Sequence, residues 1–395
     1  MTIEIPDGSP FTLANLPYGV FSRPGEPARV GAAVGDHLVD LAPTLDEALF
    51  WQPTLNALLA AGPSRWAALR GRLLDLLTGN GGRRAGKPYL ISRAEVRMHQ
   101  PFDVGDYVDF YSFIDHARNL GRILRPGTEP LTPNWRHLPI GYHGRSGTIV
   151  VSGTPINRPR GQRRLEGEEL PGFGPSTRLD IEAEVGFVIG PASTPGQPVA
   201  ASRFVEHVFG VVLVNDWSAR DIQAWEYVPL GPFLGKSFAT SISPWVVPLD
   251  ALRGARVAPP AQEPPPLPHL VDDDPWALAL TLEVSLNGEV VSHPPFAAMY
   301  WTPGQQLAHL TSNGASVRPG DLLASGTVSG PEPDQWGSLI ELTDDGRSPI
   351  RLASGETRGF LEDGDTVVIS ATAPGVDGRP IGLGEVRGTI QPARA

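Results

Sequence analysis

The chain has 395 residues, a length that favours two domains over a single hydrophobic core. It contains no cysteine, which excludes disulfide bonds, thiolate nucleophiles and zinc sites with cysteine ligands. The formal net charge of -11 argues against nucleic acid or an anionic membrane surface as a partner. Because the sequence has no apolar run long enough to span a bilayer and no signal-peptide pattern, we expect a cytoplasmic protein.

Residues 1–101 are predicted to form a small separate domain. Short apolar runs alternate with turn signals at Arg23–Gly25 and Gly35–Asp36, a pattern typical of strands. An amphipathic helix follows, and we expect Ser64 to cap it and the glycines from Gly79 to Gly82 to end it. Because this part carries no cluster of titratable side chains, we expect it to support the fold or a dimer contact.

Residues 102–395 are expected to form a mixed β-roll with a few helices. The chain has 45 glycines and 42 prolines, which favours a loop-rich, mainly β protein over a helical bundle. The proline-rich segment 259–275 predicts an extended surface loop suited to a dimer contact. Thr302-Pro-Gly-Gln305 predicts a helix with a capping box. Strands are predicted near the end of the chain at 322–325, 339–342, 366–370 and 384–390.

The first group of reactive side chains surrounds His116. Ser112-Phe-Ile-Asp115 predicts a capping box that starts a helix, and Arg125-Pro-Gly127 is expected to end it. Asp109 and Tyr111 come just before this helix. A lone helical histidine more often packs or faces solvent, but a helix N-terminus disfavours imidazolium, so His116 is a candidate neutral base.

Two acidic residues interrupt the apolar segment 179–189. Side chains in a strand alternate between faces, so Glu182 and Glu184 are predicted to share one face. Packing two like charges into a fold is unfavourable unless a cation lies between them. A solvated strand face is the alternative that this segment alone leaves open.

The next group follows the apolar strand 209–215. Ser218 is expected to cap the following helix, and Lys236 comes later among apolar and glycine neighbours. Helical spacing lines four side chains along one side of this segment: Asp216, Arg220, Gln223 and Tyr227. An exposed polar helix face is the alternative for Arg220, and an ordinary surface position is the alternative for Lys236.

The last group lies near the end of the chain. Thr327 is predicted to lie in a glycine-flanked turn after a strand, and Glu341 stands between apolar residues. A buried carboxylate needs a cation, a histidine or hydrogen-bond donors as a partner. A structural salt bridge is the alternative for Glu341.

Together these residues predict a metal site beside a base. The acidic side chains form an all-oxygen ligand set: Asp109, Glu182, Glu184 and Asp216. In a chain without cysteine such a set favours Mg²⁺ or Ca²⁺ over softer metals. His116 would be the base and Glu341 its carboxylate partner. Donors for anionic oxygens would be Arg125, Lys236, Gln223, Tyr111 and Tyr227.

Several segments resemble the fumarylacetoacetate hydrolase family. The matching segments run in order through most of residues 100–390, whereas the first hundred residues match only loosely. They are 106–112, 116–119, 133–135, 137–144, 215–223, 225–238 and 319–327. The resemblance implies a small Src-homology-three-like β-barrel, a following β-roll and a homodimer.

The resemblance also implies roles for individual residues. Metal ligands would be Asp109, Glu182, Glu184 and Asp216, and a second cation would lie beside Asp216, Lys236 and Thr240. His116 would be the catalytic base, supported by Arg220, Lys236 and Glu341. Substrate contacts would come from Tyr111, Arg125, Tyr142, Gln223, Tyr227 and Thr327. Two segments depart from the family pattern: 113–115, where Asp115 would raise the pKa of His116, and the residues after Asp377.

The implied reaction is metal-dependent hydrolysis of a carbon–carbon bond in 4-fumarylacetoacetate, a dicarboxylic diketone. Its products would be fumarate and acetoacetate, in the last step of tyrosine and phenylalanine breakdown. A related hydrolase of the fumarylpyruvate or acylpyruvate type and a 2-oxo acid decarboxylase are the alternative enzymes. A non-catalytic metal-binding scaffold is the alternative from another class, but it gives no reason for His116 and Glu341 to accompany the ligands.

Overall fold

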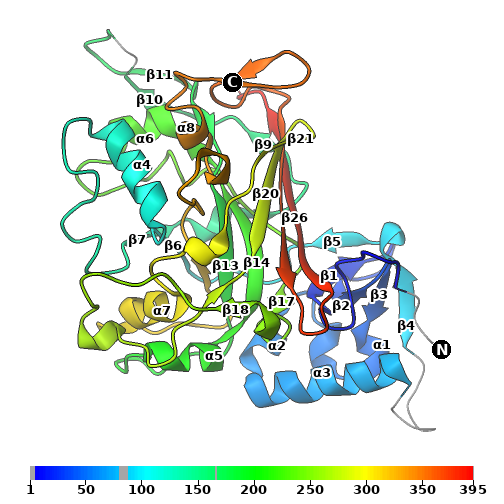
Figure 1. Ribbon diagram of the computed structural model, residues 1–395. Helices are drawn as coiled ribbons and strands as arrows, with labels where there is room; N and C mark the ends of the chain where they lie inside the picture. The colour runs from blue at the N-terminus through cyan, green and yellow to red at the C-terminus, as the bar shows by residue number, and fades with distance from the viewer. Residues whose placement is uncertain (1–4, 80–87, 165–166, 395) are drawn as a thin grey trace.

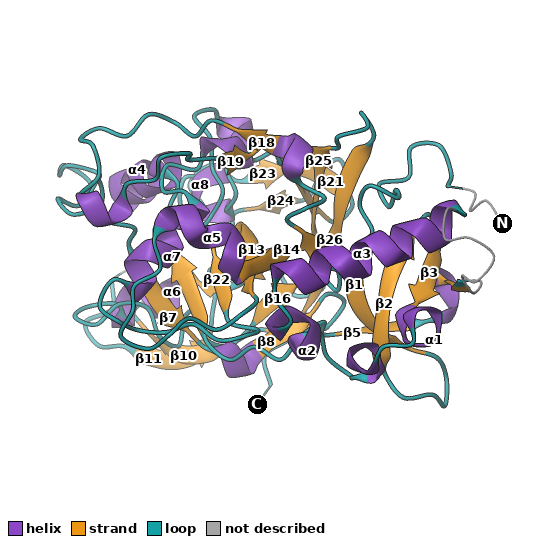
Figure 2. Cartoon of the chain, turned by 90° about the horizontal axis from the view of Figure 1, so that it is seen from below, coloured by secondary structure: helices purple, strands orange, loops and turns teal. Residues whose placement is uncertain are grey.

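The chain folds into a mainly β protein with a small number of helices, as the sequence predicts (Figures 1 and 2). This computed structural model describes residues 5–79, 88–164 and 167–394. Within these residues the strands form one eight-stranded sheet, two five-stranded sheets and four two-stranded ribbons. None of the described helices is long and apolar enough to cross a bilayer.

The first five strands form an antiparallel sheet of their own, in the order β4-β3-β2-β1-β5. They are β1 (Tyr18–Ser22), β2 (Arg29–Val34), β3 (His37–Asp40), β4 (Tyr89–Ser92) and β5 (Arg97–His99). The accompanying helices are α1 (Leu41–Leu45), η1 (Ala48–Trp51), α2 (Asn56–Ala60), α3 (Pro63–Thr78) and η2 (Arg93–Glu95). Figure 2 shows α3 lying along this sheet, where Leu69 and Leu73 join the same apolar cluster as Val20 and Val30.

The start of α3 differs from the prediction. The helix begins at Pro63 after Gly62, and no side chain caps it, so Ser64 lies within the first turn. Proline suits this place because the first turn does not need its missing N–H group. The predicted end is confirmed, since Gly79 has a φ of 78°, the left-handed conformation that commonly ends helices. The glycines that follow lie outside the described residues.

The eight-stranded sheet is the centre of the molecule. Its order is β7-β6-β22-β13-β14-β16-β8, with β17 paired to β14, and the β22–β6 and β16–β8 pairs are parallel while the others are antiparallel. Its strands are β6 (Tyr107–Phe110), β7 (Gly141–Gly144), β8 (Ile149–Val151), β13 (Ala183–Ile189), β14 (Val208–Asp216), β16 (Thr240–Ile242), β17 (Val247–Pro248) and β22 (Leu322–Ala324).

A second five-stranded sheet covers one face of this centre, in the order β21-β20-β25-β26-β9. Its strands are β9 (Ile156–Asn157), β20 (Thr281–Leu286), β21 (Glu289–Ser292), β25 (Thr366–Pro374) and β26 (Pro380–Gln391). Strand β14 is apolar on both faces because it lies between two cores. Leu213 packs in the cluster of the second sheet, with Ile369, whereas Val212 packs in the cluster of the N-terminal sheet, with Val30.

Four ribbons complete the β structure: β10 (Arg160–Arg163) with β11 (Gly172–Pro175), β12 (Leu179–Asp180) with β15 (Ser218–Ala219), β18 (Arg256–Val257) with β19 (Ala277–Leu278), and β23 (Ile350–Arg351) with β24 (Thr357–Arg358). The proline-rich segment 259–275 is the loop that joins β18 to β19. It is largely exposed, as predicted, but Leu270 is fully buried in the cluster that contains Trp135 and Trp301.

The remaining helices are short. They are η3 (Ser146–Thr148), η4 (Ala201–Arg203), η5 (Arg253–Ala255), η6 (Pro268–Leu270), η7 (Phe296–Ala298), η8 (Pro333–Gln335), α4 (Ile114–Leu124), α5 (Phe204–His207), α6 (Arg220–Glu226), α7 (Pro303–Thr311) and α8 (Leu339–Leu342). The capping box predicted for Thr302 and Gln305 is confirmed at the start of α7.

Three other local predictions are wrong. Ser112 does not cap α4, because its hydroxyl accepts a hydrogen bond from Gln306 Nε2 at 2.8 Å. Ser218 does not cap α6, because its hydroxyl donates to the backbone carbonyl of Asp216 at 3.0 Å. The predicted strand 339–342 is the helical turn α8, since a short and mostly apolar segment does not by itself distinguish strand from helix.

Candidate active site

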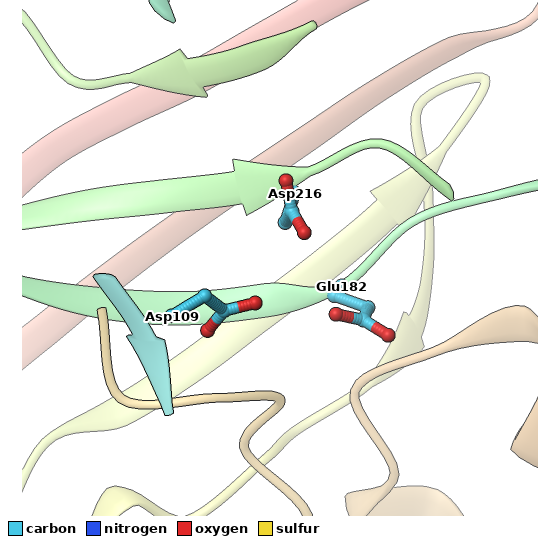
Figure 3. Close-up of side chains that lie close together, drawn as sticks. All are labelled: Asp109, Glu182 and Asp216. Carbon is cyan, nitrogen blue, oxygen red and sulfur yellow. The ribbon is translucent and has the colours of Figure 1, made fainter. Parts of the chain in front are cut away.

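Three carboxylates from distant parts of the chain meet near the ends of the central strands (Figure 3). Asp109 lies on β6, Asp216 is the last residue of β14, and Glu182 comes just before β13. One oxygen from each lies within 4.8 Å of the others, and all three residues are buried. This arrangement could hold one divalent cation.

Glu184, the fourth predicted ligand, is fully buried on β13 but does not belong to that 4.8 Å group. Glu182 lies just before β13, so it does not belong to the strand that carries Glu184. The predicted strand 179–189 is in fact two strands, β12 and β13. The alternative of a solvated face is excluded, because Glu182 and Glu184 are 5% and 0% exposed.

The buried oxygens of Asp109 and of the neighbouring Glu184 fit a bound cation. No donor group within the described residues gives a hydrogen bond to either oxygen of Glu184 or to Oδ1 of Asp109. Burial, then the charges of Asp109 and Glu182, raises the pKa of Glu184 well above its ordinary value. Burial and the charge of Asp216 raise the pKa of Asp109 in the same way. Unpartnered buried carboxylates are unfavourable, and a hard divalent cation with oxygen ligands would stabilise them.

Two cationic side chains contact Glu182. Lys236 donates a hydrogen bond to Glu182 and another to Asp216 Oδ2 at 3.0 Å. A guanidinium nitrogen of Arg220, Nη2, lies 2.9 Å from Glu182 Oε1. Burial alone would raise the pKa of Glu182, but Lys236 and Arg220 lower it below its ordinary value. Both cations are buried, so the surface positions considered as alternatives are excluded.

Asp216 is also held by two hydroxyl groups. Thr240 Oγ1 donates to Asp216 Oδ1 at 2.7 Å, and the hydroxyl of Tyr142 donates to Oδ2 at 2.9 Å. The structure therefore places Asp216, Lys236 and Thr240 together, the group that the resemblance assigned to a second cation.

His116 and Glu341 form a buried pair. His116 Nδ1, on the first turn of α4, lies 2.7 Å from Glu341 Oε2, and the two residues are 3% and 2% exposed. Glu341 also accepts hydrogen bonds from Asn119 Nδ2 at 3.0 Å, Ser329 Oγ at 3.0 Å and Ser338 Oγ at 2.7 Å. Burial raises the pKa of Glu341, but His116 and these donors bring it below its ordinary value.

The acid that departs from the family pattern lies on the same helix turn as His116. Asp115 forms an ion pair with Arg118 at 3.8 Å, and its pKa is raised, chiefly by burial. Its charge is therefore partly balanced on its own helix.

His116, Asp109 and Glu182 line one cavity of about 330 Å³, whereas Asp216 and Glu184 do not. Its polar lining is Asp109, Tyr111, His116, Arg125, Tyr142, Glu182, Arg220, Gln223, Lys236 and Thr327. Apolar walls come from Leu120, Leu124, Ile140, Leu230 and Pro232. Thr327 Oγ1 is buried without a hydrogen-bond partner in the described part of the chain, so it is free to contact a ligand. Tyr227 is not part of the lining and is 43% exposed, so the structure does not bring this predicted substrate contact to the others.

The sequence reasoning did not single out four residues that support the site: Asp180, Asn119, Ser329 and Ser338. Asp180 accepts a hydrogen bond from Arg220 Nε at 2.7 Å, and the other three donate to Glu341. Asp180 stands two residues before Glu182 in the same acidic segment, which was the available signal. The serines and Asn119 carry no such signal, because their role depends on tertiary contacts.

Two family models match the chain. The model of the fumarylacetoacetase N-terminal region matches residues 14–101, and that of the fumarylacetoacetate (FAA) hydrolase C-terminal region matches residues 107–391. The chain is 48% identical over 413 residues to the fumarylacetoacetase of Homo sapiens, covering 99% of this chain and 98% of that protein. It is 44% identical over 414 residues to the fumarylacetoacetase of Arabidopsis thaliana, with the same coverage.

Solved structures share the fold at low sequence identity. A fumarylacetoacetate hydrolase from psychrophilic Exiguobacterium antarcticum aligns with a TM-score of 0.58 at 18% identity, covering 96% of this chain and 100% of that chain. The maleylpyruvate hydrolase from Sphingobium sp. SYK-6, in complex with manganese(II) ion and pyruvate, aligns with a TM-score of 0.55 at 15% identity, with the same coverage.

Proposed function

The chain belongs to the fumarylacetoacetate hydrolase family, and we propose from this premise that it hydrolyses a carbon–carbon bond of 4-fumarylacetoacetate. The products are fumarate and acetoacetate, in the last step of tyrosine and phenylalanine breakdown. One observation carries the proposal: the buried His116–Glu341 pair and the carboxylate group of Asp109 and Glu182 face the same cavity. A general base that can activate water and a candidate metal site therefore lie beside the same cavity.

We propose Mg²⁺ or Ca²⁺ as the metal, with Asp109, Glu182, Glu184 and Asp216 as its ligands. The all-oxygen donor set and the unpartnered oxygens of Glu184 support this choice. When bound, the metal supplies Lewis-acid polarisation of a substrate carbonyl. The neighbourhood of Asp216, Lys236 and Thr240 is the proposed place of a second cation.

His116 is the proposed general base. With Nδ1–H donated to Glu341, the lone pair of Nε2 is free to take a proton from water. The resulting hydroxide attacks the carbonyl carbon next to the bond that breaks and forms a tetrahedral oxyanion. When that intermediate collapses, the electron pair of the carbon–carbon bond passes to the acetoacetate enolate. His116 then returns its proton to the enolate carbon.

Cationic and polar groups around the cavity stabilise these anions. Arg220, Lys236 and Gln223 line the cavity and are the proposed donors to the developing oxyanion, where losing one donor typically costs about 3 to 4 kcal/mol. Arg125 lines the cavity and suits a substrate carboxylate. The remaining proposed substrate contacts in the cavity are Tyr111, Tyr142 and Thr327. Tyr227, which lies outside its lining, stays a prediction from the resemblance alone.

We further propose that the chain divides into domains 1–101 and 102–395, the first a Src-homology-three-like barrel. The five strands β1 to β5 pair with one another in a sheet of their own, which supports this division. A homodimer is proposed because large apolar side chains are exposed near the site, among them Leu230 at 96% and Phe233 at 63%. A cytoplasmic location is proposed because a chain without cysteine needs no oxidising compartment.

The test is incubation of the purified protein with fumarylacetoacetate and Mg²⁺. We expect loss of diketone absorbance with release of fumarate and acetoacetate, loss of turnover on chelation, and recovery when Mg²⁺ is restored. Fumarylpyruvate, assayed in parallel, decides between the related hydrolases by the ratio of kcat/KM values. Release of carbon dioxide without fumarate would instead indicate a decarboxylase, and metal binding without any turnover would indicate a scaffold.

A further inference from the structure

Asp180 joins two parts of the site that the mechanism uses for different purposes. Its carboxylate is fully buried on β12. Oδ2 accepts a hydrogen bond from Arg220 Nε at 2.7 Å and one from the backbone N–H of Ile340 at 3.1 Å. Oδ1 accepts the backbone N–H of Leu339 at 2.7 Å. One carboxylate thus holds both a guanidinium group and the first turn of α8.

The contact with α8 leads to the base. The first N–H groups of a helix have no partner inside it, and Asp180 satisfies those of Leu339 and Ile340. Since α8 is a single turn, fixing its start also fixes where the side chain of Glu341 begins. Glu341 in turn orients His116.

The contact with Arg220 leads to the metal carboxylates. Arg220 Nη2 lies 2.9 Å from Glu182 Oε1, and Nη1 donates to Gln223 Oε1 at 3.2 Å. A guanidinium group is planar, so holding its Nε also fixes the direction of the other two nitrogens. Asp180 itself does not line the cavity.

We propose that Asp180 is a positioning residue. It fixes the position of the His116–Glu341 pair relative to the Arg220–Glu182 pair across the cavity. This inference rests on the proposed function, in which base and oxyanion donors act on one carbonyl group. A displacement of about 1 Å between such groups can reduce the rate about 10²-fold. A purely structural role would lower stability without a selective loss of kcat.

The test compares D180N with the wild type, both loaded with Mg²⁺ and assayed with fumarylacetoacetate. We expect kcat to fall about 10²-fold while KM changes less than about threefold, because the substitution disturbs only the relative position of the base and the oxyanion donors. D221N is the matched control. Asp221 is also a buried acid and follows Arg220 in the chain, but its side chain accepts from Ser176 Oγ at 2.6 Å and the Thr177 backbone at 2.8 Å and makes no hydrogen bond or ion pair with either pair. We expect D221N to lower the thermal unfolding temperature but to keep kcat within about twofold.

A double-mutant cycle tests the route through Glu341. If Asp180 acts partly by placing Glu341, adding D180N to E341Q should reduce kcat by less than about tenfold, well below its effect in the wild type. Equal effects of D180N in both backgrounds would overturn this route.

A variant that keeps the charge covers the case in which D180N does not fold. D180E moves the carboxylate by one methylene group, and we expect kcat to fall at least about tenfold with the fold retained. A folded Asp180 variant with wild-type kcat overturns the inference and leaves the proposed function intact. An inactive wild type, by contrast, overturns the proposed function itself.

Discussion

Two buried glutamates of the site, Glu184 and Glu341, have opposite surroundings. Four side chains contact the carboxylate of Glu341: the imidazole of His116, two serine hydroxyls and an amide. The carboxylate of Glu184 accepts no hydrogen bond from a donor group within the described residues and lies near other acids. The pKa of Glu341 is accordingly lowered, despite its burial, whereas burial and neighbouring charges raise the pKa of Glu184.

The difference shows which buried carboxylate is satisfied by hydrogen bonds from the chain itself, without a bound metal. The base side satisfies its buried charge with its own hydrogen bonds, so the geometry of His116 should not depend on a metal. On the carboxylate side Lys236 and Arg220 pair with Glu182, but no donor reaches Glu184, and a bound cation would offset the charge that remains there. If the two sides are separate, a substitution on one side should have little effect on the properties of the other.

The largest expected effect comes from removing the base. H116Q should reduce kcat about 10²- to 10⁴-fold, the usual contribution of positioned base catalysis. Because His116 is not a proposed ligand, the affinity for Mg²⁺, measured by calorimetry, should stay within about twofold of the wild type. Unchanged turnover in H116Q would rule out its assignment as the base.

On the carboxylate side, E184Q should weaken Mg²⁺ binding at least about tenfold, since a charged ligand becomes neutral. The control is E341Q, which removes a buried carboxylate from the base side and should leave the Mg²⁺ affinity close to that of the wild type. Calorimetric titration of both variants measures this contrast. Equal losses of affinity would mean that the two sides are not separate.

The two glutamates should also respond to pH with opposite signs in the metal-free protein. A raised pKa in the fold stabilises Glu184 below its unfolded pKa of roughly 4.3, and this stability is lost as the pH rises through the raised value. The lowered pKa of Glu341 contributes stability above roughly pH 4.3, which is lost as the pH falls through the lowered value.

Thermal unfolding between about pH 4 and pH 8 in chelator measures this difference. The unfolding temperature of E184Q should rise relative to that of the wild type as the pH increases. That of E341Q should fall relative to the wild type over the same range. Parallel curves for the two variants would contradict the assigned surroundings.

The smallest expected effect concerns one hydroxyl of the base side. S338A removes the hydrogen bond that Ser338 donates to Glu341 at 2.7 Å, while Asn119 and Ser329 still donate. A hydrogen bond to a charged group contributes about 1.5 kcal/mol, so kcat should fall about tenfold or less. The Mg²⁺ affinity should not change. A fall in kcat as large as that of H116Q would mean that the remaining donors cannot hold Glu341.

Much of the site could be predicted from residue types and local patterns. Asp216 at the end of an apolar strand, Glu182 beside β13 and Glu341 between apolar residues all signal carboxylates that burial makes unfavourable without partners. The mainly β architecture followed from the glycine and proline content and the short apolar runs.

Helix starts could not be predicted as well, because their capping depends on distant partners. Ser112 looks like a helix cap, but its hydroxyl accepts from Gln306, 194 residues away. Ser218 likewise turns to the carbonyl of Asp216 instead of the helix that follows. Local sequence offers each serine several partners, and only the packed structure selects one.

The sequence by itself determined which side chains are available for the chemistry: the acids, the histidine and the two cations. Only the tertiary structure decided that residues 339–342 form a helical turn and that Asp180, 159 residues before Leu339, holds its start. The physical reason is that a segment of four residues, three of them apolar, is compatible with strand or helix. The choice between them depends on where the backbone N–H groups find acceptors, and here those acceptors come from another part of the fold.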